Sequence, residues 1–595
     1  MTTEKALDWR LVLAVYALVC ASFAARALYN AETVPLLADT DDAMRLVVVR
    51  DLLAGQGWYD NIQHRMNTPF GGEMHWSRLA DLPLAGLLQL LRPAFGAGAE
   101  AIAAFVLPLL WLFALLYLCA RITMKLAGRE GLLAALILPA FALGVTAEFA
   151  PGRLDHHSLQ ILLLMAMVWL SIEALSRPGA AIWAGIAAAT SIALGIEGLP
   201  SVGAAILTFG LMWVSRPERA ARTRSFGLSF AGATLVHLAT GVAPERWLVP
   251  ACDAISLTYG AAAVGVGVVF TALSLLPLGE RSVWARLGAG LGAGGLMLAM
   301  LAVAFPQCLG GPYAALDPWL REVWLGRITE AAPLWEFMRG DPVYPLAVAV
   351  PSLIGLGAIA FRLWRGPTDG RSEWLAYAVF LSFAIVTMLI QIRASRMATP
   401  LAVPACAWLI AAARERYLRR RDLAGTALLA ASWIGSAGLA VGLIVSLIVN
   451  GLPSSAARLV ADAKLEDQRQ CLMPEAFAAL AAMPPERVMT PIDLGAHMLA
   501  LTPHEVVAAP YHRNEAGVRD ALDFFNRPIE QARLILERRG VSLVVICPAL
   551  PELAGRTDTA KGSFVALHKS RELPAWLDEI SPEGTPLKVY GVVPR

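Results

Sequence analysis

Long apolar runs separated by short polar segments fill the first 450 residues of the chain. Runs of about 17–25 residues are long enough to cross a bilayer as helices. The pattern therefore predicts a mostly α-helical, polytopic membrane protein of about thirteen transmembrane helices. The predicted spans are residues 11–29, 99–120, 130–147, 158–174, 180–195, 200–214, 225–242, 253–277, 287–305, 342–361, 373–391, 397–413 and 424–449.

The pattern changes after Asn450, where charged residues return and the apolar runs shorten. Val541–Cys547 has the composition of a buried strand, and Arg519–Arg539 has that of a helix with one apolar face. We therefore predict two parts, a transmembrane domain over residues 1–450 and a small soluble α/β domain over residues 451–595.

Arginine and lysine are concentrated in alternate loops of the transmembrane part. Because cytoplasmic loops carry the excess of these residues, the bias predicts a cytoplasmic N-terminus and two long outer loops over residues 30–83 and 306–342. The expected location is a bacterial-type inner membrane, with the C-terminal domain in the periplasm. The basic loop residues are Arg121, Lys125, Arg129, Arg177, Arg216, Arg219, Arg222, Arg224, Arg281, Arg286, Arg362, Arg365, Arg371, Arg414, Arg416, Arg419, Arg420 and Arg421.

The composition supports a membrane protein. Hydrophobic residues make up 57% of the chain and charged residues 16%, and the mean hydropathy is +0.57. The net charge of +2 gives no reason to expect nucleic acid as a partner. The seven cysteines contain no CxxC pair, so no zinc or redox motif is predicted. Cys471 and Cys547 are expected to be buried free thiols, with a disulfide as the alternative if their domain is extracytoplasmic.

Three carboxylates, Asp39, Asp41 and Asp42, follow the first span on the predicted outer face. Such a cluster repels itself unless it is solvated, caps a helix or binds a cation. Asp42–Leu53 has the pattern of an amphipathic helix lying on the bilayer, so Asp41 or Asp42 can be its N-cap. The alternative is that Asp39 and Asp41 converge on a divalent cation.

A second cluster, Asp155-His156-His157, follows Pro151-Gly152 between two predicted spans. Because Pro and Gly interrupt a helix, the next helix is expected to start at Asp155, with both histidines in its first turn. Asp155 and His157 then form a half-site for Mn²⁺ or Mg²⁺, and the imidazole favours manganese. A capped helix with interfacial histidines is the alternative interpretation.

Basic residues on the predicted outer face are candidates for binding a phosphate. Arg393 and Arg396 stand almost alone at the start of the twelfth span, and His75 and Arg78 lie in the first long loop. Arginine can hold a phosphate through paired hydrogen bonds, but these positions equally suit interfacial anchors. The second long loop adds several acids, and the residues alone do not single out Glu330 among them.

Together these features resemble the catalytic subunit of the oligosaccharyltransferases, in the GT-C superfamily of glycosyltransferases that use lipid-linked sugars. Asp41, nine residues before Arg50-Asp51, is similar to the first metal-binding aspartate of that family, and Asp155-His156-His157 resembles its second acidic motif. Arg327-Ile-Thr-Glu330 resembles the segment whose glutamate completes the site. Arg396 is similar to the arginine that meets the pyrophosphate of the donor.

The resemblance implies a metal-dependent, inverting transfer of a sugar or oligosaccharide. The donor is then a polyprenyl-(di)phosphate-linked sugar in the membrane, and the acceptor is a protein, a lipid or a polysaccharide. The implied ligands of Mn²⁺ or Mg²⁺ are Asp41, Asp155, His157 and Glu330, with Asp39, Asp42 and His156 as secondary candidates. The implied catalytic residues are Asp41 and Glu330. The implied donor phosphate-binding residues are Arg396, Arg393, His75 and Arg78.

One motif departs from the family pattern. The family's WWDYG sequence, which reads the Ser or Thr of an N-glycosylation sequon, corresponds here to Pro491-Ile-Asp493-Leu-Gly495, without either tryptophan. Those tryptophans build the pocket for the acceptor hydroxyl, so the resemblance does not predict which acceptor is read. Asp493 stays an acceptor-side candidate, and Tyr511, His512 and Arg513 join it unless they form only a structural turn.

A secondary transporter or flippase for a lipid-linked or envelope precursor is the competing class. Such a protein needs charged residues along a path at the middle of the membrane, whereas here they gather in the outer loops. His237 and Glu197 are the exceptions, and both are predicted near a span end. The sequence therefore favours the glycosyltransferase.

Overall fold

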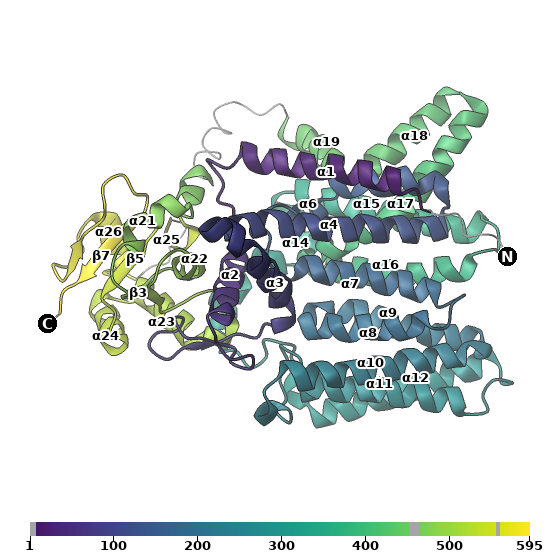
Figure 1. Cartoon of the computed structure of the whole chain (residues 1–595), viewed down its shortest axis with the longest axis horizontal. Coiled ribbons are helices and arrows are strands. Elements are labelled where there is room, and N and C mark those ends of the chain that lie inside the picture. The colour runs from purple at the N-terminus through teal and green to yellow at the C-terminus, as the bar shows by residue number, and fades with distance from the viewer. Residues whose placement is uncertain (1–6, 452–464, 555–559, 595) are drawn as a thin grey trace.

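The computed structural model describes residues 7–451, 465–554 and 560–594. Figure 1 shows long helices aligned side by side, with the strands gathered beyond one end of them. Among the described residues, eight helices are long and apolar enough to cross a membrane, or nine if one bent pair forms a single span. The prediction of a mostly helical, multi-pass membrane protein is confirmed, and the count of thirteen spans stays a prediction.

The helices of the apolar part follow the predicted spans, except that α3 lies between the first two and was not predicted. They are α1 (Trp9–Tyr29), α3 (Arg78–Phe95), α4 (Ala99–Leu126), α5 (Leu132–Ile137), α6 (Leu143–Glu148), α7 (His157–Glu173), α8 (Ala180–Leu194), α9 (Leu199–Ser215), α10 (Ala220–Gly241), α11 (Leu257–Leu275), α12 (Val283–Ala304), α15 (Val343–Arg365), α16 (Arg371–Ile390), α17 (Ser395–Arg420), α18 (Leu423–Ser436) and α19 (Gly438–Asn450). The last two are the bent pair, at 94° to each other.

The predicted third span, residues 130–147, is interrupted. Its α5 and α6 are separated by a short 3-10 helix, Leu138–Phe141, that contains Pro139. Proline lacks the N–H that an α-helix needs and its ring clashes with the preceding turn. The break leaves Glu148 as the last residue of α6.

Helix α2 (Thr40–Leu53) does not lie on the bilayer as predicted. All its residues from Asp42 to Val49 are buried. Val47 packs into a core shared with the C-terminal region, while Leu46 packs against residues of α3 and α4. The amphipathic interpretation is wrong because α2 is enclosed between the helical part and the C-terminal region, as Figure 1 shows.

The C-terminal region contains a five-stranded mixed sheet in the order β4-β3-β5-β7-β6. Strand β3 runs parallel to β4 and β5, and β7 runs antiparallel to β5 and β6. The small α/β region is therefore confirmed. Its strands are β3 (Arg487–Met489), β4 (Glu505–Val506), β5 (Leu543–Ile546), β6 (Leu577–Glu579) and β7 (Lys588–Val592), and its helices are α21 (Ala478–Ala481), α22 (Ile492–Leu501), α23 (Glu515–Asn526), α24 (Ile529–Arg539), α25 (Pro551–Ala554) and α26 (Phe564–Ser570).

Two details of this region differ from or refine the predictions. The predicted strand Val541–Cys547 contains β5, but the predicted helix Arg519–Arg539 is two helices, α23 and α24, separated at Pro528. The expectation of two free thiols is wrong, since Cys471 and Cys547 form a disulfide. A second disulfide joins Cys252 to Cys308, in the connections that follow α10 and α12.

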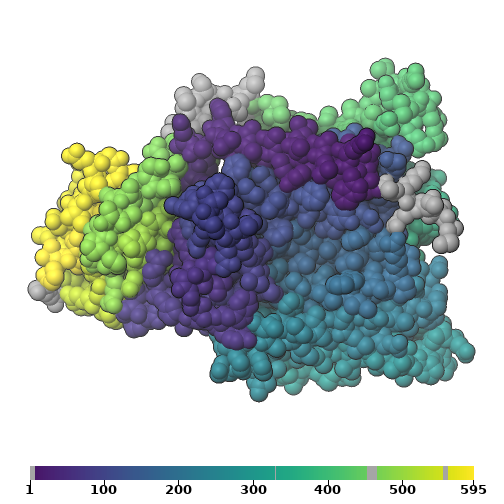
Figure 2. Space-filling view, viewed as in Figure 1, coloured from purple at the N-terminus to yellow at the C-terminus, as the bar shows by residue number. Residues whose placement is uncertain are grey.

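The first long loop reaches the C-terminal region through direct hydrogen bonds. The Arg65 guanidinium donates to the carbonyl oxygens of Leu499 at 2.9 Å and Thr502 at 3.0 Å. The Tyr511 hydroxyl donates to the carbonyl of Thr40 at 3.2 Å. Figure 2 shows the dark surface of this loop lying against the green and yellow C-terminal residues. The loop also holds β1 (Ile62–Gln63) and β2 (Gly72–Glu73), and the second long loop holds α13 (Pro318–Val323) and α14 (Leu334–Gly340).

Candidate functional site

The buried carboxylate of Asp42 joins the start of α2 to the segment before α7. Its Oδ1 accepts hydrogen bonds from the backbone N–H groups of Leu154 at 2.7 Å and Asp155 at 2.9 Å. Its Oδ2 accepts one from Arg153 Nη1 at 2.9 Å. Burial raises the pKa of Asp42 to about 8, although Arg153 opposes this. Asp42 therefore brings the two predicted acidic clusters together.

Asp39 and Asp41, the two acidic neighbours of Asp42 in the first cluster, have different surroundings. Asp39 is the N-cap of α2, accepts the Asp41 backbone N–H at 2.9 Å, and pairs with Arg153 at 2.8 Å. The cap is thus Asp39, not Asp41 or Asp42. Burial, followed by the charges of Asp155 and Asp39, raises the pKa of Asp41 well above its usual range. That shift is consistent with carboxylates crowded around one point.

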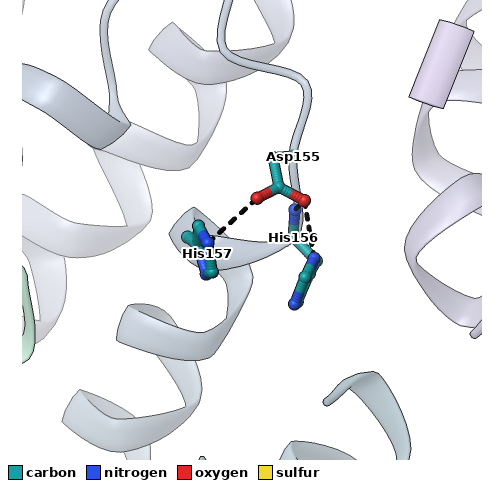
Figure 3. A group of neighbouring side chains, drawn as sticks. All are labelled: Asp155, His156 and His157. Carbon is teal, nitrogen blue, oxygen red and sulfur yellow. Dashed lines mark hydrogen bonds and ion pairs between the residues drawn. The ribbon is translucent and has the colours of Figure 1, made fainter. Parts of the chain in front are cut away.

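Asp155, His156 and His157 form a compact group, shown in Figure 3. Asp155 Oδ1 lies 2.6 Å from His156 Nδ1, and Oδ2 lies 3.1 Å from His157 Nε2. Burial disfavours the charge on Asp155, but the two histidines hold its pKa well below the usual range. Burial likewise opposes a charged His156, yet Asp155 raises the pKa of that imidazole to about 10.

Glu197, which the sequence analysis left as a span-end exception, is part of this group. It lies in the short 3-10 helix Ile196–Gly198 between α8 and α9. Its Oε2 is 3.3 Å from His157 Nδ1 and 3.5 Å from His156 Nε2. No motif marks Glu197 in the sequence, and the one signal there is its place at a turn beside Gly195, Gly198 and Pro200 at the predicted outer face.

A second missed acid, Glu148, connects the site to Arg396. Its Oε2 lies 3.1 Å from Arg153 Nη2, and its Oε1 lies 3.6 Å from Arg396 Nη1. Arg396 Nη2 in turn pairs with Glu330 Oε2 at 3.0 Å. The structure therefore places Glu330 against Arg396, whereas Glu197 is the acid beside the two histidines.

Two large cavities meet at these residues. One of about 710 Å³ is lined by His75, Trp76, His156, Glu197, Tyr313 and Arg393 among others. The other, of about 690 Å³, is lined by Asp39, Asp41, Arg327, Glu330, Asp493 and Glu552 among others. Only two lining residues, His157 and Arg396, are shared by both sets. We call these the histidine cavity and the acidic cavity.

The four predicted phosphate-binding residues differ in position. Arg393 and Arg396 line the histidine cavity, and Arg393 Nη1 lies 4.0 Å from Glu197 Oε1. His75 also lines it, and burial, followed by the charge of His512, holds the pKa of His75 well below its usual value. Arg78 is buried, with its Nη1 3.4 Å from Asp81 Oδ2. Three of the four predicted residues, His75, Arg393 and Arg396, therefore line the histidine cavity, and Arg78 does not.

The predicted acceptor-side residues are divided between the cavities. Asp493 faces the acidic cavity beside Glu552, whose carboxylate accepts the backbone N–H groups of Ile492 and Asp493 at 2.8 Å each. His512 and Arg513 line the histidine cavity, where both pair with Asp253 at 2.7 Å.

Tyr511 is buried beside the first acidic cluster. Burial, followed by the charge of Asp41, raises the pKa of Tyr511 well above its usual value. Its hydroxyl is already bonded to Thr40, so Tyr511 holds α2 in place. Both interpretations of Tyr511, acceptor-side residue and structural turn, stay predictions, while His512 and Arg513 reach a cavity.

The side chains of the central group fit a divalent cation. Asp155 Oδ2 is buried and, within the described residues, accepts no hydrogen bond. One potential ligand atom from each of Asp155, His156 and His157 lies within 4.8 Å of the others. Carboxylate and imidazole together suit Mn²⁺, Zn²⁺ and Mg²⁺.

Comparison with solved structures defines the class of fold. The archaeal oligosaccharyltransferase AglB from Archaeoglobus fulgidus, in complex with an inhibitory peptide and a dolichol-phosphate, matches with a TM-score of 0.63 at 13% identity, over 98% of this chain and 74% of that one. The A. fulgidus oligosaccharyltransferase with Zn and sulfate matches with a TM-score of 0.61 at 14% identity, over 98% and 73%. The apo form of the same A. fulgidus protein matches with a TM-score of 0.61 at 14% identity, over 90% of this chain and 69% of that one.

These matches show that the chain shares the fold of the archaeal oligosaccharyltransferase. The particular likeness is to the archaeal oligosaccharyltransferase, and it extends over nearly the whole chain. No protein-family model and no curated protein sequence matches the chain.

Proposed function

We propose that the protein is a membrane glycosyltransferase that moves a sugar or oligosaccharide from a polyprenyl-(di)phosphate donor to an acceptor on the outer face of the membrane. The observation that carries this proposal is the position of His157 and Arg396 on the boundary between two cavities. A transfer between two large molecules needs a donor chamber and an acceptor chamber that meet at the reacting groups. The solved relative with a bound peptide and a dolichol-phosphate supports the same assignment.

The histidine cavity suits the donor. Arg393 and Arg396 are two guanidinium groups that line it, and they can hold a phosphate leaving group by charge-assisted hydrogen bonds. As the glycosidic bond breaks, negative charge grows on that phosphate, and Arg396 stabilises it. Glu148 and Glu330 keep the Arg396 guanidinium in place from two sides.

The acidic cavity suits the acceptor. Asp41 and Glu330 line it and are the carboxylates that can orient a nucleophilic group toward the boundary. Asp155 and His157, with Asp41, hold the divalent cation, and Glu330 joins them by family resemblance. The cation, when bound, supplies a Lewis acid that neutralises charge on the donor phosphate. Mn²⁺ or Mg²⁺ is the proposed ion, and Zn is present in one solved relative.

The finer topology belongs to the same proposal. We infer thirteen spans, a transmembrane domain over residues 1–450, an extracytoplasmic domain over residues 451–595, and a bacterial-type inner membrane. Two disulfides on the face that carries the acidic clusters support an oxidising, extracytoplasmic location for that face.

The test compares cells that carry the wild-type protein, Asp41→Asn, or a control, Asp369→Asn, in the connection after α15. Mass spectrometry measures polyprenyl-linked saccharides and the glycans of envelope protein, lipid and polysaccharide. We expect a lipid-linked sugar to accumulate and one glycoconjugate to disappear in Asp41→Asn only, and the missing product identifies the acceptor. Unchanged pools at normal protein levels overturn the proposal and favour a transporter.

A further inference from the structure

Glu197 is the second carboxylate beside the two histidines, after Asp155, and none of the motifs used above includes it. Its Oε2 lies 3.3 Å from His157 Nδ1, while the opposite ring nitrogen, Nε2, lies 3.1 Å from Asp155 Oδ2. The His157 imidazole therefore has a carboxylate beside each nitrogen, and its Nδ1 also makes a hydrogen bond to Gln160 Oε1 at 3.3 Å.

This arrangement has a known use at metal sites. An imidazole that binds a metal through one nitrogen usually donates the N–H of its other nitrogen to a carboxylate, which fixes the tautomer and the ring orientation. In this chain, Asp155 Oδ2 is buried and, as far as the chain is described, accepts no hydrogen bond. Glu197 Oε2 is also buried without a hydrogen-bond partner among the described residues, but Nδ1 already faces the Gln160 side-chain carbonyl oxygen as its acceptor, so Nε2 is the nitrogen left for a cation.

We propose that Glu197 is a positioning residue that holds His157 with Nε2 directed at the cation. The inference rests on the proposed function and adds a residue to its site. With Gln160 as the acceptor of the Nδ1–H, the negative charge of Glu197 beside that nitrogen favours the same tautomer, and Asp155 and the Nε2 lone pair are left for the cation. Glu330, by contrast, pairs with Arg396 and is more than half exposed.

Glu197 also connects the cation to the donor side. Its other oxygen, Oε1, lies 4.0 Å from Arg393 Nη1 at the edge of the histidine cavity. One side chain thus contacts a proposed metal ligand and a proposed phosphate-binding arginine. This link predicts that losing Glu197 weakens metal binding first and donor use as a consequence.

The test measures Mn²⁺ affinity of the purified full-length protein in detergent, by electron paramagnetic resonance of free Mn²⁺. Glu197→Gln and Glu197→Ala are expected to weaken binding about 10- to 100-fold, as for other carboxylates behind a ligating histidine. Glu197→Asp recovers part of the loss. Glu245→Gln, an exposed acid in the connection between α10 and α11, is expected to bind like wild type.

A double-mutant cycle separates positioning from a general structural role. If Glu197 acts through His157, then Glu197→Gln causes no further loss of Mn²⁺ affinity in a His157→Ala protein. The inference is overturned if Glu197→Gln lowers the Mn²⁺ affinity by the same factor in the wild-type and His157→Ala proteins. It is also overturned if a folded Glu197→Gln protein binds Mn²⁺ as tightly as wild type. Thermal unfolding and gel filtration identify any variant that does not fold, and Glu197→Asp then carries the test. A wild-type protein that binds no Mn²⁺ instead contradicts the metal part of the proposed function.

Discussion

Asp42 Oδ1 accepts the backbone N–H of Asp155 at 2.9 Å, across 113 residues of sequence. This bond and its neighbour from Leu154 set the distance between the two acidic clusters. Asp42 is therefore a structural residue of the site, although it looked like a metal ligand or a cap in the sequence. The distinction leads to a first prediction.

Replacing Asp42 by Ala leaves the buried N–H groups of Leu154 and Asp155 without their acceptor, while Arg153 keeps Asp39 and Glu148 as partners. We expect a loss of about 1–3 kcal/mol in stability, together with weaker Mn²⁺ binding because Asp155 is no longer fixed. Asp42→Asn keeps one oxygen acceptor and is expected to lose less of both. Thermal unfolding and Mn²⁺ titration measure the two effects, and an Ala variant as stable as wild type contradicts the assignment.

Metal removal provides a second prediction. Treatment with EDTA is expected to abolish sugar transfer by purified protein, and added Mn²⁺ to restore it. Asp155→Asn should stay inactive at the same Mn²⁺ concentration, because it lacks the charged ligand that lies between both histidines. Activity that survives exhaustive chelation rules out the metal-dependent mechanism.

Arg396 is predicted to act on the donor rather than on the fold alone. Arg396→Gln removes the guanidinium that lies between the cavities, and we expect transfer to fall on the order of 100-fold. Arg414→Gln, an exposed arginine near the other end of α17, serves as the matched control. Binding of a polyprenyl phosphate, measured separately, should weaken in Arg396→Gln and stay unchanged in Arg414→Gln.

The acid pair Asp493 and Glu552 predicts a pH-dependent stability. Burial, followed by the charge of Asp493, raises the pKa of Glu552 from 4.5 to about 8 in the folded protein. A carboxyl with a raised folded pKa binds more protons in the folded state, so stability falls as pH rises from about 4.5 to about 8. Glu552→Gln should flatten the Tm profile over this range, and Glu475→Gln, an exposed acid of the same region, should leave it unchanged.

Thiol labelling checks the disulfides and the location of the outer face. The chain has seven cysteines, of which Cys20, Cys119 and Cys406 are free. Denatured, unreduced protein from membranes should therefore take up three maleimide labels, and reduced protein seven. Seven labels before reduction would contradict both disulfides and remove the support they give to the topology.

Much of the fold followed from the sequence because it depends on local pattern. Apolar runs predict helices wherever they occur, and the positions of Asp41, Asp155 and Arg396 near span ends already placed them on one face. The alternation of apolar and polar residues in α2 led to the wrong prediction that this helix lies on the bilayer, because an amphipathic pattern does not show what covers the polar face. Arg45 on that face is buried against Asp81 at 2.7 Å, not exposed to water.

Glu148 and Glu197 could not be assigned because their partners are distant in the sequence. Glu148 contacts Arg396, which lies 248 positions later in the chain. Glu197 contacts His157 only because α7, α8 and α9 pack together. Neither acid stands in a recognisable motif. Their roles depend on the packing of helices, which apolar periodicity does not determine.

The hydrogen bond from Tyr511 to the carbonyl of Thr40 has a consequence for biosynthesis. Tyr511 is translated 471 positions after Thr40, whose carbonyl it bonds. Helix α2 therefore gains this contact only after synthesis has passed the last apolar helix and reached Tyr511. Truncated chains that end after that helix lack this bond, and in them the first acidic cluster keeps only the contacts from its earlier partners, such as Arg153.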